Sequence, residues 1–319
     1  MNMSLLFHAR YTGFVPRVVI AALALGVSLA APPGWAAGAK PRTFPTPEAA
    51  VKELIAAAQL ADAKALLDIL GPDAAPIVQS GDAVADKHGR ERFLQAYRES
   101  SKIETSGDAK AMLSVGKDGW PFPIPIVKSS VGWSFDTKQG AEEILNRRIG
   151  RNELAAIEVL RAYVDAQREY YRLNPQKDRL PHFAQRLAST EGKHDGLYWA
   201  VKTGEPPSPL GPLVASAAAE GYKKSADGKP AAYHGYAYRI LTEQGPAAKG
   251  GAYDYVANGR MIGGFAMIAY PAGYGSSGVM SFIVNHDGEV YEKDLGPETA
   301  AVAQKITRFD PDKSWQRTQ

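Results

Sequence analysis

The sequence predicts an α+β protein, because helical and extended patterns occur in separate runs along the chain. Apolar residues recur at helical spacing between residues 48 and 97, and at alternate positions between residues 120 and 135. A second helical pattern covers residues 152–173, and alternating patterns return from residue 233 onward. We therefore expect N-terminal helices with a small bent antiparallel sheet, followed by a long helix packed on a C-terminal antiparallel sheet.

The first 39 residues have the pattern of a secretory signal peptide. Arg10 and Arg17 precede an apolar run over residues 18–31, and small residues follow that run. The run is too short to span a bilayer comfortably, although an uncleaved N-terminal anchor is the alternative. We expect a periplasmic or secreted protein whose mature chain begins near residues 37–40 or, in the alternative, one that is membrane-anchored at its N-terminus.

Composition indicates a globular protein without disulfides. Hydrophobic residues make up 45% and charged residues 22% of the chain, and there is no cysteine. The roughly 280 residues after the signal are long for one core, so we expect domains at residues 40–150 and 151–319. The net charge of +3, without a basic stripe interleaved with aromatics, gives no case for nucleic acid. No later apolar run approaches spanning length, so no stable membrane span is expected after signal cleavage.

Three helices are expected before the first strand. A Thr-Pro pair at residues 46–47 is typical of a helix N-terminus, and apolar spacing extends that helix to about residue 58. A second helix covers residues 62–70 and ends at a Gly-Pro pair, and a third covers residues 88–97. Residues 105–115 then lead into a strand.

In the stretch WPFPIPIV, large apolar residues alternate with prolines. The apolar positions are Trp120, Phe122, Ile124 and Ile126, and the prolines are residues 121, 123 and 125. This alternation gives an extended chain one apolar face, while the prolines remove the N–H donors along one edge. The pattern favours an edge strand that pairs on one side over a polyproline II segment that docks a partner.

The chain then returns through VGWSFD, which predicts a two-stranded ribbon with an aromatic face. Trp133 and Phe135 share parity, so we expect both to be buried together with Trp120 and Phe122. If the ribbon is exposed instead, it forms a binding surface. Trp120 and Trp133 are therefore candidate binding residues.

An arginine cluster lies at the end of a short helix that Asp136 caps and Gly150 breaks. Arg147, Arg148 and Arg151 form the cluster, and bidentate contacts of this kind suit an anionic partner or substrate. The pattern favours an ion-pair network between the two halves, for which the carboxylates are Glu142, Glu143 and Glu153. We expect a rigid junction in which at least one of the arginines pairs with a carboxylate or caps backbone carbonyls.

The C-terminal half begins with a helix over residues 152–173, which is the expected spine of that half. Residues 174–212 are irregular and rich in proline, which suits either a surface lid or a long connection. Strands follow from residue 233, with a turn at residues 285–288 and a short helix at residues 298–306.

Two short motifs match ligand-binding patterns by letter only. Residues 273–278 match GxGxxG, but a strand follows where a dinucleotide site needs a helix, so a glycine-rich turn is expected. Asn285, Asp287 and Glu289 match part of a calcium loop without its late bidentate Glu, so a plain β-turn is expected. No histidine has metal-site spacing and no nucleophile motif occurs. The sequence therefore predicts no metal site and no cofactor, and it leaves open whether the protein is an enzyme and which residues would be catalytic.

A specific resemblance to one family rests on five segments: VGKDGWPFPIPIVK, GWSFDTKQGAEEILNRRIGRNE, GLYWAVKTGEPPSPLGPL, YHGYAYRIL and MSFIVNHDGEVYEKDLG. They resemble domain of unknown function 2950, a family of exported bacterial proteins of unknown activity. The resemblance covers residues 44–315. It implies export and brings no catalytic assignment with it.

Two looser resemblances concern the fold. The segment TPEAAVKELIAAAQLADAKALLDIL resembles the first helices of cone-shaped domains like nuclear transport factor two, some of which are enzymes with an Asp–His pair. Asp82, Asp86 and His88 are the nearest positions to such a pair. The segment AIEVLRAYVDAQREYY and the sheet after it are similar to the heads of type IV pilins and pseudopilins, although no apolar pilin helix leads directly into this head. These resemblances imply a cone-like N-terminal part and a pilin-head-like C-terminal part.

The function expected from the sequence is non-catalytic: an exported protein that binds an envelope protein partner or helps an assembly at the envelope. Its candidate binding residues are Arg147, Arg148, Arg151, Trp120 and Trp133. The alternative is a small-molecule-binding domain or a hydrolase with a pocket between the two halves. A deep pocket with convergent titratable groups would favour that alternative.

Overall fold

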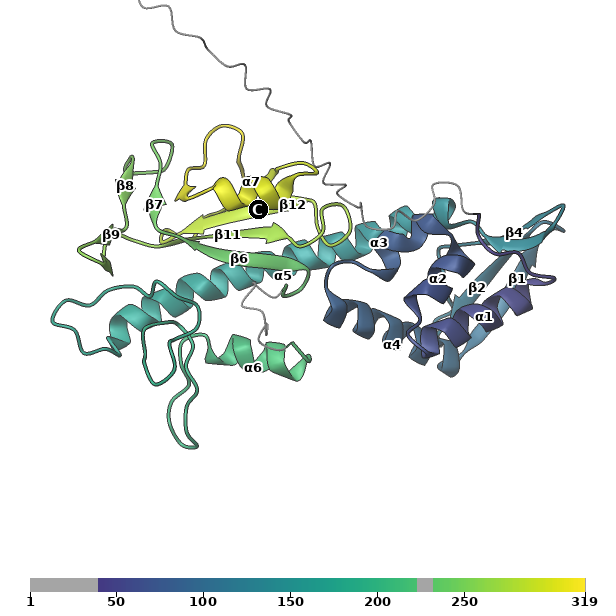
Figure 1. Ribbon diagram of the computed structural model, residues 1–319, viewed down its shortest axis with the longest axis horizontal. Helices are drawn as coiled ribbons and strands as arrows, with labels where there is room; N and C mark the ends of the chain where they lie inside the picture. Colours follow the sequence, from purple (N-terminus) through teal and green to yellow (C-terminus); the bar gives the residue numbers. More distant parts are fainter. Residues whose placement is uncertain (1–39, 223–231, 319) are drawn as a thin grey trace, which may run out of the picture. The chain divides into compact units, whose positions relative to one another are not determined.

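The computed structural model describes residues 40–222 and 232–318 (Figure 1). The predicted signal peptide at residues 1–39 lies outside the described residues. Helices and antiparallel sheets are both present, which confirms the α+β class. Within the described residues, no helix is both long and apolar enough to cross a membrane.

The N-terminal helices begin where capping residues satisfy their first N–H groups. They are α1 (Pro47–Gln59), α2 (Ala63–Leu70), a 3-10 turn η1 (Pro72–Ala74), α3 (Ala75–Val78) and α4 (Ala83–Glu99). Thr46 Oγ accepts a hydrogen bond from Ala49 N at the start of α1. Asp62 and Asp82 cap α2 and α4 in the same way. Because Asp82 caps it, α4 starts before the predicted helix at residues 88–97.

The first sheet follows these helices and bends around the proline-rich stretch. Its strands are β1 (Ser101–Ser106), β2 (Lys110–Val115), β3 (Trp120–Pro121), β4 (Ile126–Ser129) and β5 (Gly132–Phe135). The strand order is β1-β2-β4-β5, with β3 also paired to β2. WPFPIPIV is therefore not an edge strand, and the prediction is wrong on this point. Both ends of the stretch pair with β2, while its middle leaves the sheet at Pro123 and Pro125, which have no N–H to contribute.

The aromatic residues of this region differ in burial. Phe135 is 1% exposed and Trp133 is 8% exposed, so both belong to the N-terminal apolar cluster, which α1, α2 and the first sheet form. Phe122 packs partly buried against that cluster, with its ring 5.3 Å from that of Phe93. Trp120 is 37% exposed, so the prediction that it is buried with the others is wrong. It pairs through its backbone at the end of β2, where its ring remains open to solvent.

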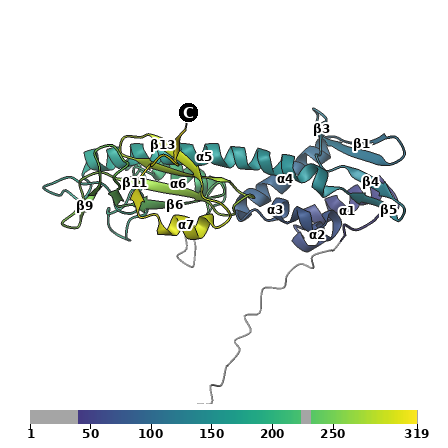
Figure 2. The same cartoon turned by 90° about the horizontal axis from the view of Figure 1, so that it is seen from above.

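The predicted break at Gly150 does not occur, because α5 (Thr137–Leu173) is one helix of 37 residues (Figure 2). A single interior glycine costs a helix only about 1 kcal/mol, which tertiary packing on both sides offsets. Thr137 and Gly140 are buried at the start of α5, and residues between Ala156 and Tyr170 contribute to a second, C-terminal apolar cluster. The described residues all belong to one compact unit. A division into domains at residue 150 stays a prediction.

The C-terminal sheet has α5 on one face and α7 on the other (Figure 2). Its strands, in spatial order, are β15 (Gln316–Arg317), β13 (Val290–Asp294), β12 (Met280–Asn285), β11 (Ala266–Pro271) and β6 (Tyr236–Leu241). Every residue of β11 is buried, as two covered faces require. The remaining elements are α6 (Gly211–Ala219), α7 (Thr299–Lys305), β7 (Glu243–Gln244), β8 (Tyr253–Asp254), β9 (Val256–Ala257), β10 (Arg260–Met261) and β14 (Arg308–Phe309).

Candidate functional site

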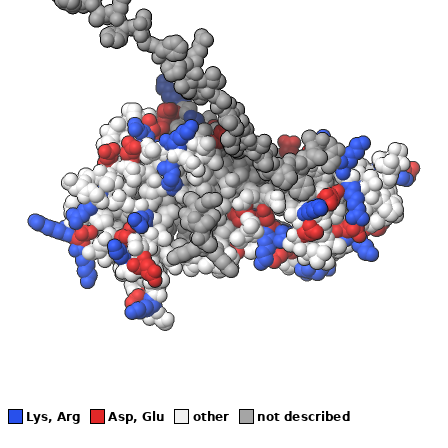
Figure 3. Space-filling view, in the orientation of Figure 1, with Lys and Arg blue, Asp and Glu red and all other residues white. Residues whose placement is uncertain are grey.

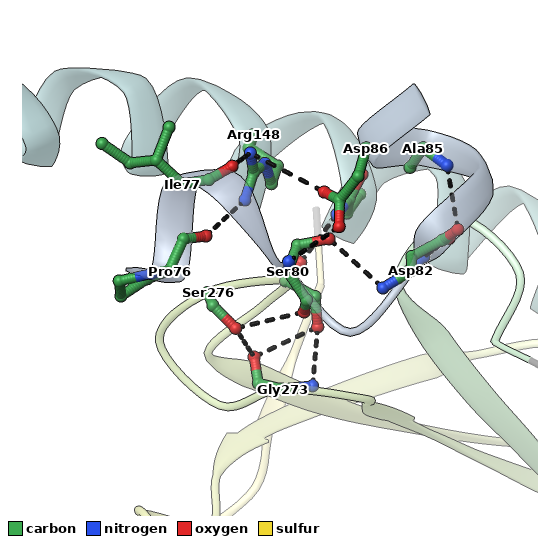
Figure 4. A network of polar contacts seen from close by, with 12 residues as sticks. Pro76, Ile77, Ser80, Asp82, Ala85, Asp86, Arg148, Gly273 and Ser276 are labelled. Carbon is green, nitrogen blue, oxygen red and sulfur yellow. Dashed lines mark hydrogen bonds and ion pairs between the residues drawn. The ribbon is translucent and has the colours of Figure 1, made fainter. Parts of the chain in front are cut away.

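Arg148 points inward from α5 and caps the short helix α3 (Figure 4). Its guanidinium donates to Pro76 O at 2.7 Å and to Ile77 O at 2.6 Å. The Asp86 carboxylate lies 3.9 Å away, and the Arg148 side chain is only 16% exposed. Burial lowers the pKa of this guanidinium, and the charge of Asp86 opposes that shift. The expectation that at least one arginine caps backbone carbonyls is confirmed.

Ser80 connects the segment before α4 to the glycine-rich turn (Figure 4). Its N–H donates to Asp86 Oδ2 at 2.9 Å, and its carbonyl accepts from Ser276 Oγ at 3.2 Å. The turn at residues 273–278 joins β11 to β12, with no helix after it. The predicted glycine-rich turn is confirmed, and the geometry is not that of a dinucleotide site.

Asp82 is buried at 3% exposure, and both of its carboxylate oxygens accept hydrogen bonds. Oδ1 accepts from Val84 N at 3.1 Å and from Ala85 N at 3.0 Å, which caps α4. Oδ2 accepts from Tyr222 O–H at 2.9 Å and from Gly235 N at 2.8 Å. Burial and the bond to Asp82 raise the pKa of the Tyr222 hydroxyl. The lone pairs of this carboxylate are thus engaged by structural donors, and no described bond joins His88 to Asp82 or Asp86.

Arg147 and Arg151 are exposed on α5, one helical turn apart, and the charges of Arg147 and of the exposed Arg92 of α4 both act on Arg151. We call these three arginines the basic face. Arg147 lies with its guanidinium carbon 5.7 Å from the ring centroid of Trp120 and pairs with Glu143. Partial burial, and then the like charges of Arg92 and Arg147, lower the pKa of the Arg151 guanidinium. Arg92 and Arg151 have no ion-pair partner among the described residues. Figure 3 shows basic and acidic side chains interspersed on one face of the protein.

Trp133 is a core residue, in contrast to Trp120. Its backbone exchanges two hydrogen bonds with Phe44, at 2.7 and 2.8 Å, which attaches the segment before α1 to the edge of β5. Lys128 lies over its ring at 5.8 Å. The structure therefore brings together Trp120, Arg147 and Arg151 and leaves Arg148 and Trp133 in packing roles. Arg92 was missed, because sequence alone does not show that α4 lies beside α5.

The segment from Asn285 to Glu289 is a plain turn, as predicted. Asp287 N donates to Asn285 Oδ1 at 3.1 Å, and Gly288 has a φ of +86°, which favours glycine. Glu289 pairs with Arg317 at 3.1 Å instead of facing the turn. Among the residues that the structure describes, no group of three His, Cys, Asp or Glu side chains is placed to hold a metal ion.

Comparison with known families decides the identity of the chain at family level. The profile described as protein of unknown function (DUF2950) matches residues 41–318. The chain belongs to this family. Neither a curated protein nor a solved structure matches it. The resemblance to pilin heads is therefore still a prediction, whereas membership of the DUF2950 family is shown.

Proposed function

We propose that this DUF2950 protein is an exported, non-catalytic module that binds an anionic envelope partner through the basic face of α4 and α5. The observation that carries the proposal is the grouping of Arg92, Arg147 and Arg151 beside the exposed ring of Trp120. Guanidinium groups suit carboxylate and phosphate groups, and an exposed indole adds apolar contact area at low entropic cost.

The electrostatics of the basic face support an anionic partner. Only Arg147 has a carboxylate partner, Glu143, among the described residues, and both side chains are about half exposed. An exposed pair of this kind contributes at most about 1 kcal/mol, so a ligand group can displace it. Partial burial, and then the like charge of Arg92, lower the pKa of the Arg151 guanidinium, so these two unpaired cations lie close enough to repel each other. A bound anion would offset this repulsion, because it could form ion pairs with both of these unpaired guanidinium groups.

The location of the protein rests on the N-terminal sequence. The basic residues and the apolar run before residue 40 have the order that a secretory signal requires. An exported chain without cysteine folds without depending on the redox state of its compartment. We propose the periplasm or the exterior as the location, with an uncleaved N-terminal anchor as the alternative.

Site-specific crosslinking in the native host tests the proposal. A photoreactive phenylalanine replaces Trp120 in one strain and Leu60, which is 80% exposed at the end of α1, in a control strain. We expect an acidic or phosphorylated envelope component to crosslink at position 120 only, and to be lost when Arg147 and Arg151 are both changed to Gln. The change Arg161→Gln, on the same helix, is the matched control because Arg161 is exposed and, within the described part of the chain, forms an ion pair only with Glu158.

Three results would count against the proposal. The first is a protein that fractionates with the cytoplasm. The second is a crosslinking pattern at position 120 that the double arginine variant leaves unchanged. The third is a loss of crosslinking in Arg161→Gln that equals the loss in the double variant. Increasing the salt concentration should also reduce the crosslinked yield, because exposed charges are screened within about 10 Å at 0.1 M salt.

A further inference from the structure

A groove at the C-terminal end of the protein has a chemistry that the proposed function does not use. It lies between the end of α7, the strand β14 and the end of β13, and has a volume of about 430 Å³. Its cationic side chains are Lys293, Lys305 and Arg308, and its apolar side chains include Leu295, Val302 and Trp315. These residues come from separate segments, so the folded chain assembles the groove.

The charge of the C-terminal groove suits one negative charge. Arg308 pairs with Glu243 at 3.4 Å and is neutralised there. Lys293 donates to the neutral hydroxyl of Ser314 at 2.7 Å, and Lys305 has no carboxylate partner among the described residues. Asp310 is the one carboxylate among the described residues that line the groove. Within the lining, two lysines against one carboxylate leave one positive charge, and Asp312, which interacts with Lys293 from outside the lining, reduces that excess. A small positive excess favours a monoanion over a doubly charged phosphate.

The apolar part of the groove lies next to these lysines. The Lys293 ammonium is 5.8 Å from the ring centroid of Trp315. One small ligand can therefore contact a cationic and an apolar group of the groove at the same time. Val302 is 36% exposed although it is a large aliphatic side chain. The groove is open to solvent, so it covers a short apolar group and cannot enclose a long acyl chain.

We propose that this C-terminal groove binds the carboxy-terminal end of a peptide whose last side chain is aliphatic. The terminal carboxylate accepts hydrogen bonds from the ammonium groups of Lys293 and Lys305, and the last side chain contacts Val302, Leu295 and Trp315. Such a peptide end carries one negative charge for the lysines and one short apolar side chain for the apolar part of the groove. Capture of a chain terminus is a recurring mode of peptide recognition.

NMR titration of the full mature chain tests this assignment with defined probes. The probe is an acetylated Gly-Ala-Leu tripeptide with a free carboxylate, compared with the same peptide as its terminal amide. The readout is the indole N–H resonance of Trp315, assigned by its loss in Trp315→Phe. We expect the free acid to shift this resonance saturably, and the amide to bind about tenfold more weakly, because a charge-assisted hydrogen bond is lost.

Matched lysine variants locate the carboxylate. Lys305→Gln should lower the affinity for the free-acid peptide about fivefold or more and leave the affinity for the amide peptide unchanged. The change removes an exposed ammonium group without altering the packing. Lys313→Gln is the control, since Lys313 is an exposed cation of the same tail that does not line the groove. Equal affinity for acid and amide, or an equal effect of both lysine variants, would overturn the proposal. So would saturable binding of laurate or inorganic phosphate in place of the peptide.

Discussion

The change Asp82→Ala should separate the two roles of one buried carboxylate. Oδ1 caps α4 through Val84 N and Ala85 N, and Oδ2 holds Tyr222 and Gly235, which lie 140 and 153 residues further along the chain. The first role is local to the helix, whereas the second connects α4 to the start of β6. Alanine removes both roles without adding volume.

The expected loss follows from these bonds. Loss of a helix cap costs about 1 kcal/mol. Gly235 N is buried and would lose its acceptor, which costs about 1–3 kcal/mol. The Tyr222 hydroxyl is only partly buried and can turn to water, so its loss should add about 1 kcal/mol. We therefore expect the free energy of unfolding to fall by about 3–5 kcal/mol.

The matched control is Asp62→Ala. Asp62 has the same residue type and capping role in α2, but its side chain accepts from Ala65 N alone, at 3.0 Å on the exposed surface. Urea denaturation followed by circular dichroism should give a loss of about 1 kcal/mol for Asp62→Ala. The difference of about 2–4 kcal/mol between the two variants measures the tertiary bonds of Asp82. Equal losses in the two variants would refute the reasoning and leave Asp82 with a capping role alone.

Two further predictions concern α5. Arg148→Met should lower the free energy of unfolding by about 3 kcal/mol, because the carbonyls of Pro76 and Ile77 and the Asp86 carboxylate lose this cationic partner. Arg151→Met should change the free energy of unfolding by no more than about 0.5 kcal/mol. Equal melting temperatures for these two variants would contradict the assignment. Gly140→Ala should destabilise by about 1–3 kcal/mol, because its Cβ would overlap the carbonyl oxygen of Pro123. Gly150→Ala should stabilise by about 0.5–1 kcal/mol, because its Cβ would meet nothing within 4 Å. Thermal melts of both variants check the sign, and a stabilised Gly140→Ala would be inconsistent with the close approach.

The local signals in the sequence predicted the starts of α1 and α2, but α4 begins at Ala83 instead of residue 88, and Asp136 precedes α5 without a side-chain capping bond. Thr46 and Asp62 cap their helices, and Gly71 ends α2, because these effects depend on a few neighbouring residues. The prediction failed where distant segments decide the outcome. Gly150 ends a helix only if nothing packs on both sides of it, and Trp120 is buried only if another element covers it.

At the candidate site, too, the sequence did not show which side chains lie together. The sequence indicated that Arg147, Arg148 and Arg151 act as one cluster, but residues four apart share a helix face and adjacent residues do not. Had the helix been recognised as continuous through Gly150, this spacing would have separated Arg148 from Arg147, but not from Arg151, because residues three apart also share a helix face. Arg92 had no such signal, because its place beside Arg151 depends on how α4 packs.

The inward and outward residues of this region depend on each other. Arg148 holds the segment before α4 against α5, and Asp82 fixes the start of α4 itself. Together these bonds set the position of α4, and therefore the position of Arg92 beside Arg147 and Arg151. A change at an inward position should thus weaken folding and anion binding together, whereas a change at Arg147 or Arg151 should weaken binding alone. If Arg148→Met kept full binding despite a lower melting temperature, the basic face would not need the α4–α5 contact, and the binding surface would have to be Arg147, Arg151 and Trp120 without Arg92.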